Sequence, residues 1–304
     1  MVSCFFMQDT VFIHKILGCS AALISAASWA LSSLLFDRLL NKISPLSMNL
    51  GKCLIGSLFL GVMLLFSNVG AMSKEALLFL GASGLLGIAL GDTLFFKSLA
   101  YLGPRLLLAL GTLGPVVTVI LAVIFLKERP PFIVWIGMAL TIGGVSWVLW
   151  ERSSVKNAEK KRAEGIKYGL LSILCASTAI ILAKAGVASV SALQATFIRL
   201  LFGAIGLLLW AGASRQISNW LSPFKNMNLL GAILMTVFIA VFGGFWLFLA
   251  AIKYTDVSTA TILNSTTPLF ILPMTALILK EKISLRAIAG AGVAVAGVIL
   301  IFLH

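Results

Sequence analysis

Charged side chains are scarce in this sequence. Aspartate, glutamate, lysine and arginine make up 11% of its 304 residues, whereas hydrophobic residues make up 60%. A soluble domain has about 25% charged and about 45–50% apolar residues. The composition therefore excludes an ordinary soluble domain and predicts an integral, multi-pass membrane protein in contact with a lipid bilayer.

Residues suited to metal or nucleophilic chemistry are also few. The four cysteines have no metal-ligand spacing, and we interpret them as small packing residues. His14 and His304 lie at the ends of predicted spans, which excludes a HExxH zinc site and disfavours a Ser-His pair. An aspartyl dyad would need Asp92 beside Asp256, which lies at the edge of a different span. We expect no metal, no cofactor and no enzyme activity.

Motifs for nucleotides and nucleic acids are absent as well. The sequence has no GxxxxGK[ST] phosphate loop, and no basic run is interleaved with aromatic residues. The net charge of +13 fits the excess of lysine and arginine that membrane proteins carry in cytoplasmic loops. No cleavable signal peptide is expected, because the apolar stretch after Lys15 continues as a full span.

Long apolar runs are what the sequence has in abundance. At about 20 apolar residues per span, ten transmembrane helices are predicted, at residues 16–36, 45–67, 76–99, 104–126, 131–150, 166–187, 191–212, 228–252, 257–279 and 284–303. The one long polar stretch falls between the fifth and the sixth. We therefore divide the chain into a first unit at 1–150, a basic linker at 151–165 and a second unit at 166–304.

The two units are related in sequence. Residues 91–150 match residues 244–303 without gaps, at a constant offset of 153 residues. Distinctive residues recur in register: Tyr101 as Tyr254, Pro115 as Pro268, and Lys127-Glu128 as Lys280-Glu281. Because each unit has an odd number of spans, the second enters the membrane from the opposite side. The duplication therefore predicts an all-α fold of two inverted five-helix repeats, with a site near the midplane where they meet.

The earlier part of each repeat matches less closely. The second and seventh spans align at an offset of 147, which places Ser44 opposite Ser191 and Lys52 opposite Arg199. The first and sixth spans show only a loose resemblance.

The repeats also differ at informative positions. Asp92 is matched by Phe245, and Gly111 by Asn264. We expect the repeats to agree where they shape the scaffold and to differ where a solute is recognised.

Two prolines lie in the middle of predicted spans. Pro115 and Pro268 each remove a backbone donor and leave a carbonyl without its helical partner. The turns before them are small or polar and include Thr112, Asn264 and Ser265. Exposed polar groups at that depth are tolerated only against protein or a wet cavity. Either these turns form a substrate site with a gating kink, or their hydroxyls only repair the kinked helix.

Asp92 is a charged residue inside the predicted third span. A charge at the bilayer centre costs about 2.5–3.5 kcal/mol, so such residues usually face a cavity or a charged partner. Asp92 is therefore a candidate for proton coupling or for binding a cationic solute. The alternative is a structural pair with Lys52, Lys97 or Arg105.

Other basic residues are embedded as well. Lys52, Arg199 and Lys184 lie near the ends of predicted spans, and we interpret them as extending along the helix toward the membrane interface. If any of them faces the cavity instead, anionic or zwitterionic solutes are expected.

Two tryptophans lie within predicted spans. Trp29 has several serines nearby, Ser32 among them, and this neighbourhood is too polar for a lipid-facing surface. We take Trp29, Ser32 and Trp246 as candidates for lining the cavity. The alternative for both tryptophans is a place in the aromatic belt at the membrane interface.

Small residues and Lys-Glu pairs close the repeats. A stripe of small residues occurs in the fifth and the tenth span: Gly137, Thr141 and Gly144, matched by Gly290, Ala294 and Gly297. Such stripes allow close helix packing, within the chain or in a homodimer. The Lys-Glu pairs at 127–128 and 280–281 are interpreted as interfacial anchors, or as gating salt bridges at opposite mouths.

These features together resemble the drug/metabolite transporter superfamily, and in particular its EamA-like members. The resemblance rests on the proline within a span, the closing Lys-Glu pair and the glycine-rich last span, each present twice, and on the stretch that begins at Gly91-Asp92. It implies ten helices, a central cavity formed by both repeats, and alternating access, usually for export. Members move amino acids, metabolites or drugs.

The expected function is secondary active transport, in the export direction, of a small organic solute such as an amino acid across the cell membrane, by a monomer or homodimer. A facilitative channel or uniporter is the alternative, and an intramembrane enzyme a weaker one.

Two indicators of orientation disagree. The resemblance places both termini in the cytoplasm, whereas the basic linker would itself be cytoplasmic by the positive-inside rule.

Overall fold

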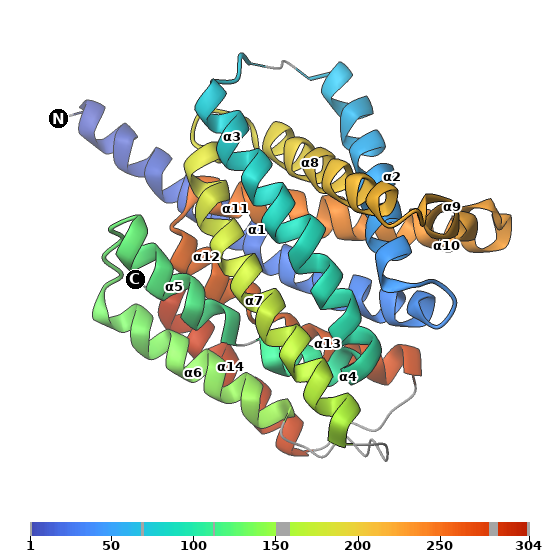
Figure 1. Ribbon diagram of the computed structural model, residues 1–304. Helices are drawn as coiled ribbons and strands as arrows, with labels where there is room; N and C mark the ends of the chain where they lie inside the picture. Colours follow the sequence, from blue (N-terminus) through green and yellow to red (C-terminus); the bar gives the residue numbers. More distant parts are fainter. Residues whose placement is uncertain (1, 68–69, 112, 150–158, 280–284, 303–304) are drawn as a thin grey trace.

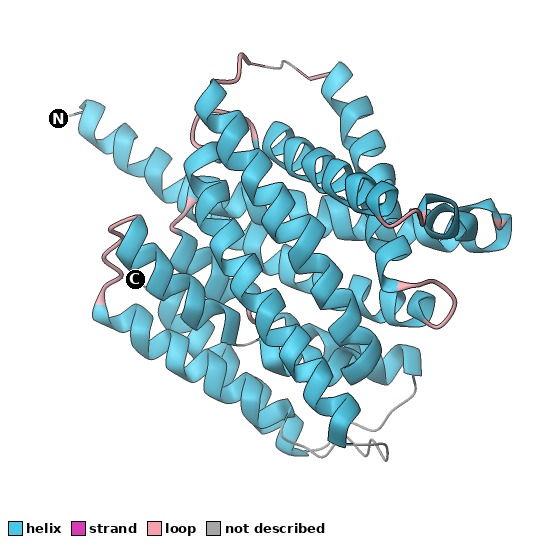
Figure 2. Ribbon diagram, viewed as in Figure 1, coloured by secondary structure: helices cyan, strands magenta, loops and turns pink. Residues whose placement is uncertain are grey.

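The computed structural model describes residues 2–67, 70–111, 113–149, 159–279 and 285–302 (Figure 1). These residues form helices joined by short turns and contain no strand, so the all-α expectation is confirmed (Figure 2). The elements of the first half are α1 (Val2–Leu40), α2 (Pro45–Leu65), α3 (Lys74–Ser83), η1 (Gly84–Asp92), α4 (Thr93–Gly111), α5 (Leu113–Phe125) and α6 (Phe132–Leu149).

The second half follows a similar order of helices. Its elements are α7 (Glu159–Val187), α8 (Ala192–Ala213), α9 (Ile217–Leu221), η2 (Ser222–Lys225), α10 (Met227–Phe238), η3 (Ile239–Trp246), α11 (Leu247–Tyr254), α12 (Val257–Asn264), α13 (Thr267–Leu279) and α14 (Leu285–Phe302). Helix α7 begins at Glu159, so the last part of the predicted linker is helical. Helix α1 likewise begins earlier than the predicted first span.

Seven helical segments among the described residues are long and apolar enough to cross a membrane. They are His14–Leu40, Pro45–Leu65, Lys74–Pro104, Lys161–Val187, Ala192–Ala213, Leu229–Tyr254 and Val257–Ile278. The other predicted spans, the fourth, fifth and tenth, fall largely on helices α5, α6 and α14. The chain is therefore a multi-pass membrane protein, and the count of ten spans stays a prediction.

Both halves contain a π-helical segment at matching positions. These segments are η1 and η3, and the paired glycines Gly91 and Gly244 lie within them. A π-helical turn is wider than an α-helical turn and is frequent at functional sites. Its position in both halves supports a common ancestry for the two units.

The first helix of each half packs against the other half. The Ser25 hydroxyl in α1 donates to the carbonyl of Gly244, at 2.9 Å, and the Ser172 hydroxyl in α7 donates to the carbonyl of Gly91, also at 2.9 Å. The donors are separated by 147 residues and the acceptors by 153, the two offsets seen in the sequence. These crossed contacts extend the repeat to the first and sixth spans, where the sequence shows only a loose resemblance.

The starts of α2 and α8 are also equivalent. The Ser44 hydroxyl accepts a hydrogen bond from the backbone N–H of Ser47 at 3.2 Å, and the Ser191 hydroxyl accepts one from the N–H of Gln194 at 3.1 Å. Serine is a preferred N-cap because its oxygen satisfies a donor that the helix leaves free. The aligned serines therefore begin the same helix in each repeat.

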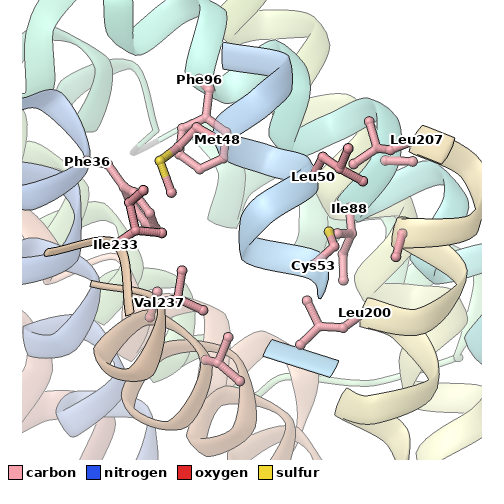
Figure 3. Packing of buried hydrophobic residues seen from close by; sticks show 14 of the residues in the cluster. Phe36, Met48, Leu50, Cys53, Ile88, Phe96, Leu200, Leu207, Ile233 and Val237 are labelled. Carbon is pink, nitrogen blue, oxygen red and sulfur yellow. The ribbon is translucent and has the colours of Figure 1, made fainter. Parts of the chain in front are cut away.

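Helices α2 and α8 share a tightly packed apolar core with η1 (Figure 3). Phe36 and Phe96 are fully buried and pack edge to face, with ring centroids 5.0 Å apart. An added Cβ on Gly84 would lie 2.4 Å from the carbonyl oxygen of Arg199. Close contact between η1 and α8 therefore requires glycine at position 84, and it fixes the placement of Arg199.

The small-residue stripes of the fifth and tenth spans pack against each other. Helices α6 and α14 lie side by side (Figure 1). An added Cβ on Gly144 would lie 2.5 Å from the backbone nitrogen of Ala294, and one on Gly297 would lie 2.7 Å from that of Thr141. Of the two interpretations of these stripes, the structure shows packing within the chain.

We predict that Gly144→Ala destabilises the protein, because the added methyl group meets the backbone of α14. Overpacking of this kind typically costs about 1–3 kcal/mol. The neighbouring Gly143 is the matched control, because nothing lies within 4 Å of its Cβ position. Thermal unfolding in detergent should therefore show a lower midpoint for Gly144→Ala and no loss for Gly143→Ala. Equal midpoints would contradict the packing.

Candidate functional site

A cavity of about 250 Å³ lies between the two halves. Its wall includes α1, η1, α4 and α5 of the first half and α7, α8, η3, α11, α12 and α13 of the second half. This volume has room for several water molecules. The space is therefore suited to a small organic molecule.

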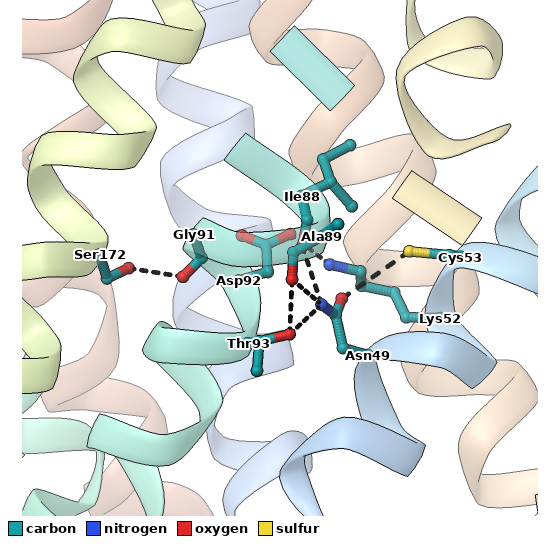
Figure 4. A network of polar contacts seen from close by, with 9 residues as sticks. All are labelled: Asn49, Lys52, Cys53, Ile88, Ala89, Gly91, Asp92, Thr93 and Ser172. Carbon is teal, nitrogen blue, oxygen red and sulfur yellow. Dashed lines mark hydrogen bonds and ion pairs between the residues drawn. The ribbon is translucent and has the colours of Figure 1, made fainter. Parts of the chain in front are cut away.

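Asp92 lines this cavity at the end of η1 and forms an ion pair with the Nζ of Lys52 (Figure 4). The interpretation that Lys52 extends toward the interface is wrong, because its side chain is only 1% exposed. Its Nζ also lies over the ring of Phe245, 4.9 Å from the centroid. Of the partners considered for Asp92, the structure shows Lys52, while the Nζ of Lys97 lies over the Tyr168 ring.

Asn49 lies one turn before Lys52 on α2 and forms hydrogen bonds around η1 (Figure 4). Its Nδ2 donates to the carbonyl of Ile88 at 2.8 Å and to the Thr93 hydroxyl at 2.9 Å. The Thr93 hydroxyl in turn donates to the carbonyl of Ala89 at 2.6 Å. These bonds satisfy polar groups of η1 and so fix the direction in which Asp92 points.

Arg199 lines the cavity from α8. The interpretation that it extends toward the interface is wrong as well, because the residue is only 6% exposed. Its Nε has no hydrogen-bond partner, and the ion pair of Asp92 with Lys52 is the one found among the described side chains. Lys52 and Arg199, which match in the repeat alignment, thus both lie near Asp92.

The polar turn between α12 and α13 contributes from the second half. Its hydroxyls donate to carbonyls three residues earlier: Ser265 to Ile262 at 2.5 Å, Thr266 to Leu263 at 2.7 Å, and Thr267 to Asn264 at 2.6 Å. These bonds repair the break in the helix. The side-chain Oδ1 of Asn264 has no partner and, like Ser265, the residue lines the cavity. The interpretation that hydroxyls repair the helix therefore holds for Ser265, Thr266 and Thr267. A role of Asn264 in binding a substrate stays a prediction.

In the first half, glycines line the cavity at the positions that match this polar segment. Gly111 and Gly114, which flank position 112, both line the cavity. Thr112 lies outside the described residues. Pro268 falls in the first turn of α13, where a missing N–H costs little. It therefore begins a new helical segment after the turn at Ser265 and Thr266, rather than kinking a continuous helix.

Aromatic rings form one wall of the cavity. Trp29 packs edge to face on Phe245, with centroids 5.0 Å apart, and on Phe95, with centroids 6.3 Å apart. All three line the cavity. Two other candidates do not line it. Ser32 is fully buried and its hydroxyl donates to the carbonyl of Trp29 at 3.3 Å, while Trp246 packs against Phe242.

Several lining residues were not among the sequence candidates. Thr261 precedes Asn264 by three residues and therefore lies on the same face of α12, where its hydroxyl also has no partner. Ser177 lies on α7 and forms a hydrogen bond with Thr118 of α5, with 2.9 Å between the oxygens. Helical spacing could have indicated Thr261. Nothing local in the sequence places α7 beside α5.

We predict that Lys52→Met destabilises the protein, because it leaves the carboxylate of Asp92 without its counter-ion. Removing one partner of a buried pair costs up to about 3–5 kcal/mol. The double variant Lys52→Met/Asp92→Asn should recover part of the loss, which a double-mutant cycle of unfolding free energies would measure. Lys97→Met is the control and should lose less. Additive losses in the cycle would contradict the pairing.

Comparison with known proteins agrees with this architecture. The sequence profile of the EamA-like transporter family matches residues 16–150 and 163–303. An uncharacterized transporter of Archaeoglobus fulgidus is 24% identical over 93% of this chain and 96% of its own length. Protein LicB of Haemophilus influenzae is 30% identical over 70% of this chain and 74% of its own. A protein crystal structure with 16% identity superposes with a TM-score of 0.69, covering 94% of each chain. The chain is thus a membrane transporter that belongs to the EamA-like transporter family.

Proposed function

We propose that this protein is a secondary active transporter of a small organic solute, such as an amino acid or a related metabolite, and that it exports the solute across the cell membrane. The solute binds in the cavity between the halves. Ten spans in two inverted repeats then expose this cavity alternately to the two sides of the membrane.

One observation carries the proposal. Of the four buried side-chain atoms without a hydrogen-bond partner among the described residues, three belong to residues that line the cavity: Arg199 Nε, Thr261 Oγ1 and Asn264 Oδ1. A buried unpaired polar group costs about 1–3 kcal/mol. Three such groups around one space are explained if a polar solute, with its water, satisfies them.

A second observation favours alternating access. Glu128, which follows α5 in the first half, accepts hydrogen bonds from the second half. Its Oε1 accepts from the N–H of Val257 at 3.2 Å, and its Oε2 accepts from the N–H of Ser258 at 3.4 Å and from the Ser258 hydroxyl at 2.8 Å. Glu128 therefore caps the start of α12, where the side chain of Asp256 makes no such bond.

The groups around this cap hold it in place. Lys127 has a φ of 55°, a conformation that is uncommon for a residue other than glycine. Helix α11 ends just before α12 begins. At this end of α11, the Nζ of Lys184 donates to the carbonyls of Ile252 at 2.5 Å and Thr255 at 3.0 Å. Lys184 thus binds the end of α11 and does not extend toward the interface as expected. The negative charge of Glu128 thus stabilises the start of α12, and the positive charge of Lys184 stabilises the end of α11.

The repeat gives this contact a counterpart. Glu281 matches Glu128, and Gly103, where α4 is interrupted with a φ of 72°, matches Asp256. Glu281 lies outside the described residues. In an inverted repeat the two glutamates lie at opposite mouths. We propose that the Glu128 cap closes one mouth of the cavity and breaks when that mouth opens.

Solute exchange in liposomes tests the transporter proposal. A carrier accelerates uptake of labelled solute when unlabelled solute is present inside, because the loaded site returns faster than an empty one. We expect saturable flux with such exchange for at least one member of a panel of amino acids, organic acids and amines. Saturable flux without exchange would favour the channel alternative. If Asp92 couples transport to protons, the response to a pH gradient is lost in Asp92→Asn.

We predict that Glu128→Ala opens one mouth of the cavity, because the start of α12 loses its cap. Hydrogen bonds to a charged group contribute about 1.5–3 kcal/mol, so the open form should increase roughly tenfold or more. The measurement is labelling of Ser265→Cys by a membrane-impermeant thiol reagent, in a protein whose native cysteines are alanine. Glu75→Ala, an exposed acidic residue on α3, is the control. Equal labelling rates in both variants would exclude the gate.

A further inference from the structure

The cavity has an excess of one positive charge. Among the described residues, two charged side chains line it, Asp92 and Arg199, and Lys52 forms an ion pair with Asp92. The ion pair of Lys52 with Asp92 is neutral as a whole. The charge of Arg199 is therefore left over, and an uncompensated charge at this depth is unfavourable.

Arg199 is placed to bind a ligand. Only 6% of the residue is exposed, its Nε has no hydrogen-bond partner, and the residue lies on the cavity wall. The carboxylate of Asp92 attracts it but makes no ion pair with it. A guanidinium group presents its N–H donors in a planar fork that matches the two oxygens of a carboxylate.

The rest of the wall limits what the anion can be. It is largely aromatic and aliphatic, with Trp29, Phe95, Phe245 and Phe248 among its residues. Most hydroxyls of the wall already donate to other protein groups, those of Ser172, Ser265 and Thr267 among them. The wall therefore suits an apolar body and leaves few donors for the several oxygens of a phosphate. The volume of about 250 Å³ is enough for one ring with a short side chain.

We propose that the transported solute is a small monoanion that carries one carboxylate on an apolar body, with the carboxylate bound to Arg199. This inference rests on the proposed function and narrows its solute, from amino acids and related metabolites to those that lack the ammonium group. A zwitterion fits less well, because its ammonium group would need Asp92, which Lys52 already neutralises. A cation would add to the positive charge that is in excess.

Calorimetric binding to the purified wild-type protein tests the solute class with probes that share one ring. The probes are phenylacetate, its neutral amide phenylacetamide, the cation 2-phenylethylammonium and the zwitterion phenylalanine. We expect phenylacetate to bind at least tenfold more tightly than the other three. Tighter binding of the cation or the zwitterion, or no detectable binding of phenylacetate, would overturn the inference.

Substitutions separate the charge of Arg199 from its packing. Arg199→Met should reduce phenylacetate affinity at least tenfold, whereas Asp92→Asn should raise it severalfold because Lys52 loses its counter-ion. Lys167→Met, which removes an exposed positive charge on α7, should leave it unchanged. Equal losses in Arg199→Met and Asp92→Asn would mean a collapsed cavity and would overturn the inference.

The binding experiment tests the carboxylate inference and the flux experiment tests the transporter proposal, so either can fail without the other. Flux of another solute class without phenylacetate binding would overturn the carboxylate inference and leave the transporter proposal standing. Selective phenylacetate binding without saturable flux of any carboxylate would support the site and overturn the proposed transport.

Discussion

A carboxylate within a membrane protein must be paired or neutral, because the surroundings solvate an isolated charge poorly. In this chain the partner of Asp92 is Lys52, and the pair brings α2 against η1. Asn49 donates to η1 one turn away on the same helix. Once this contact is made, the backbone of η1 is fixed and Asp92 faces the cavity through the side that Lys52 leaves free. Among the residues that the structure describes, Arg199 is then left without a counter-ion. The charge of the cavity follows from that single pairing.

Broken helices supply the remaining polar groups. A continuous helix satisfies its own backbone and offers a cavity only side chains, whereas a break exposes helix ends at the depth where a solute binds. The turn after α12 uses three hydroxyls to satisfy its own carbonyls, which leaves the amide of Asn264 for the cavity. At the other end of α12, Glu128 caps the first turn from the opposite half. One short helix thus connects the cavity to the proposed gate.

The repeat explains which part of the site was visible in the sequence. Asp92 and Phe245 differ between the halves, as do Gly111 and Asn264, and all four line the cavity. Comparing the halves therefore indicated the region of the site. The positions of Lys52 and Arg199 near span ends suggested the wrong surroundings for them, because a basic residue at such a position is usually found at the interface. Comparing the halves also missed the crossed contacts of Ser25 and Ser172, since the sequences of α1 and α7 have diverged while their packing has not.

Composition and periodicity alone determined that this chain is a duplicated, all-helical membrane protein, because apolar length and paired motifs are local properties of the sequence. They also indicated where the helix of the second half is interrupted, just before Pro268, because proline acts on its own helix. Only the tertiary structure decided which charges meet. Lys52 is 40 residues from Asp92, and Arg199 comes from the other half of the chain. Whether a buried charge is paired or left over depends on how the helices pack, and spacing along the sequence does not specify that.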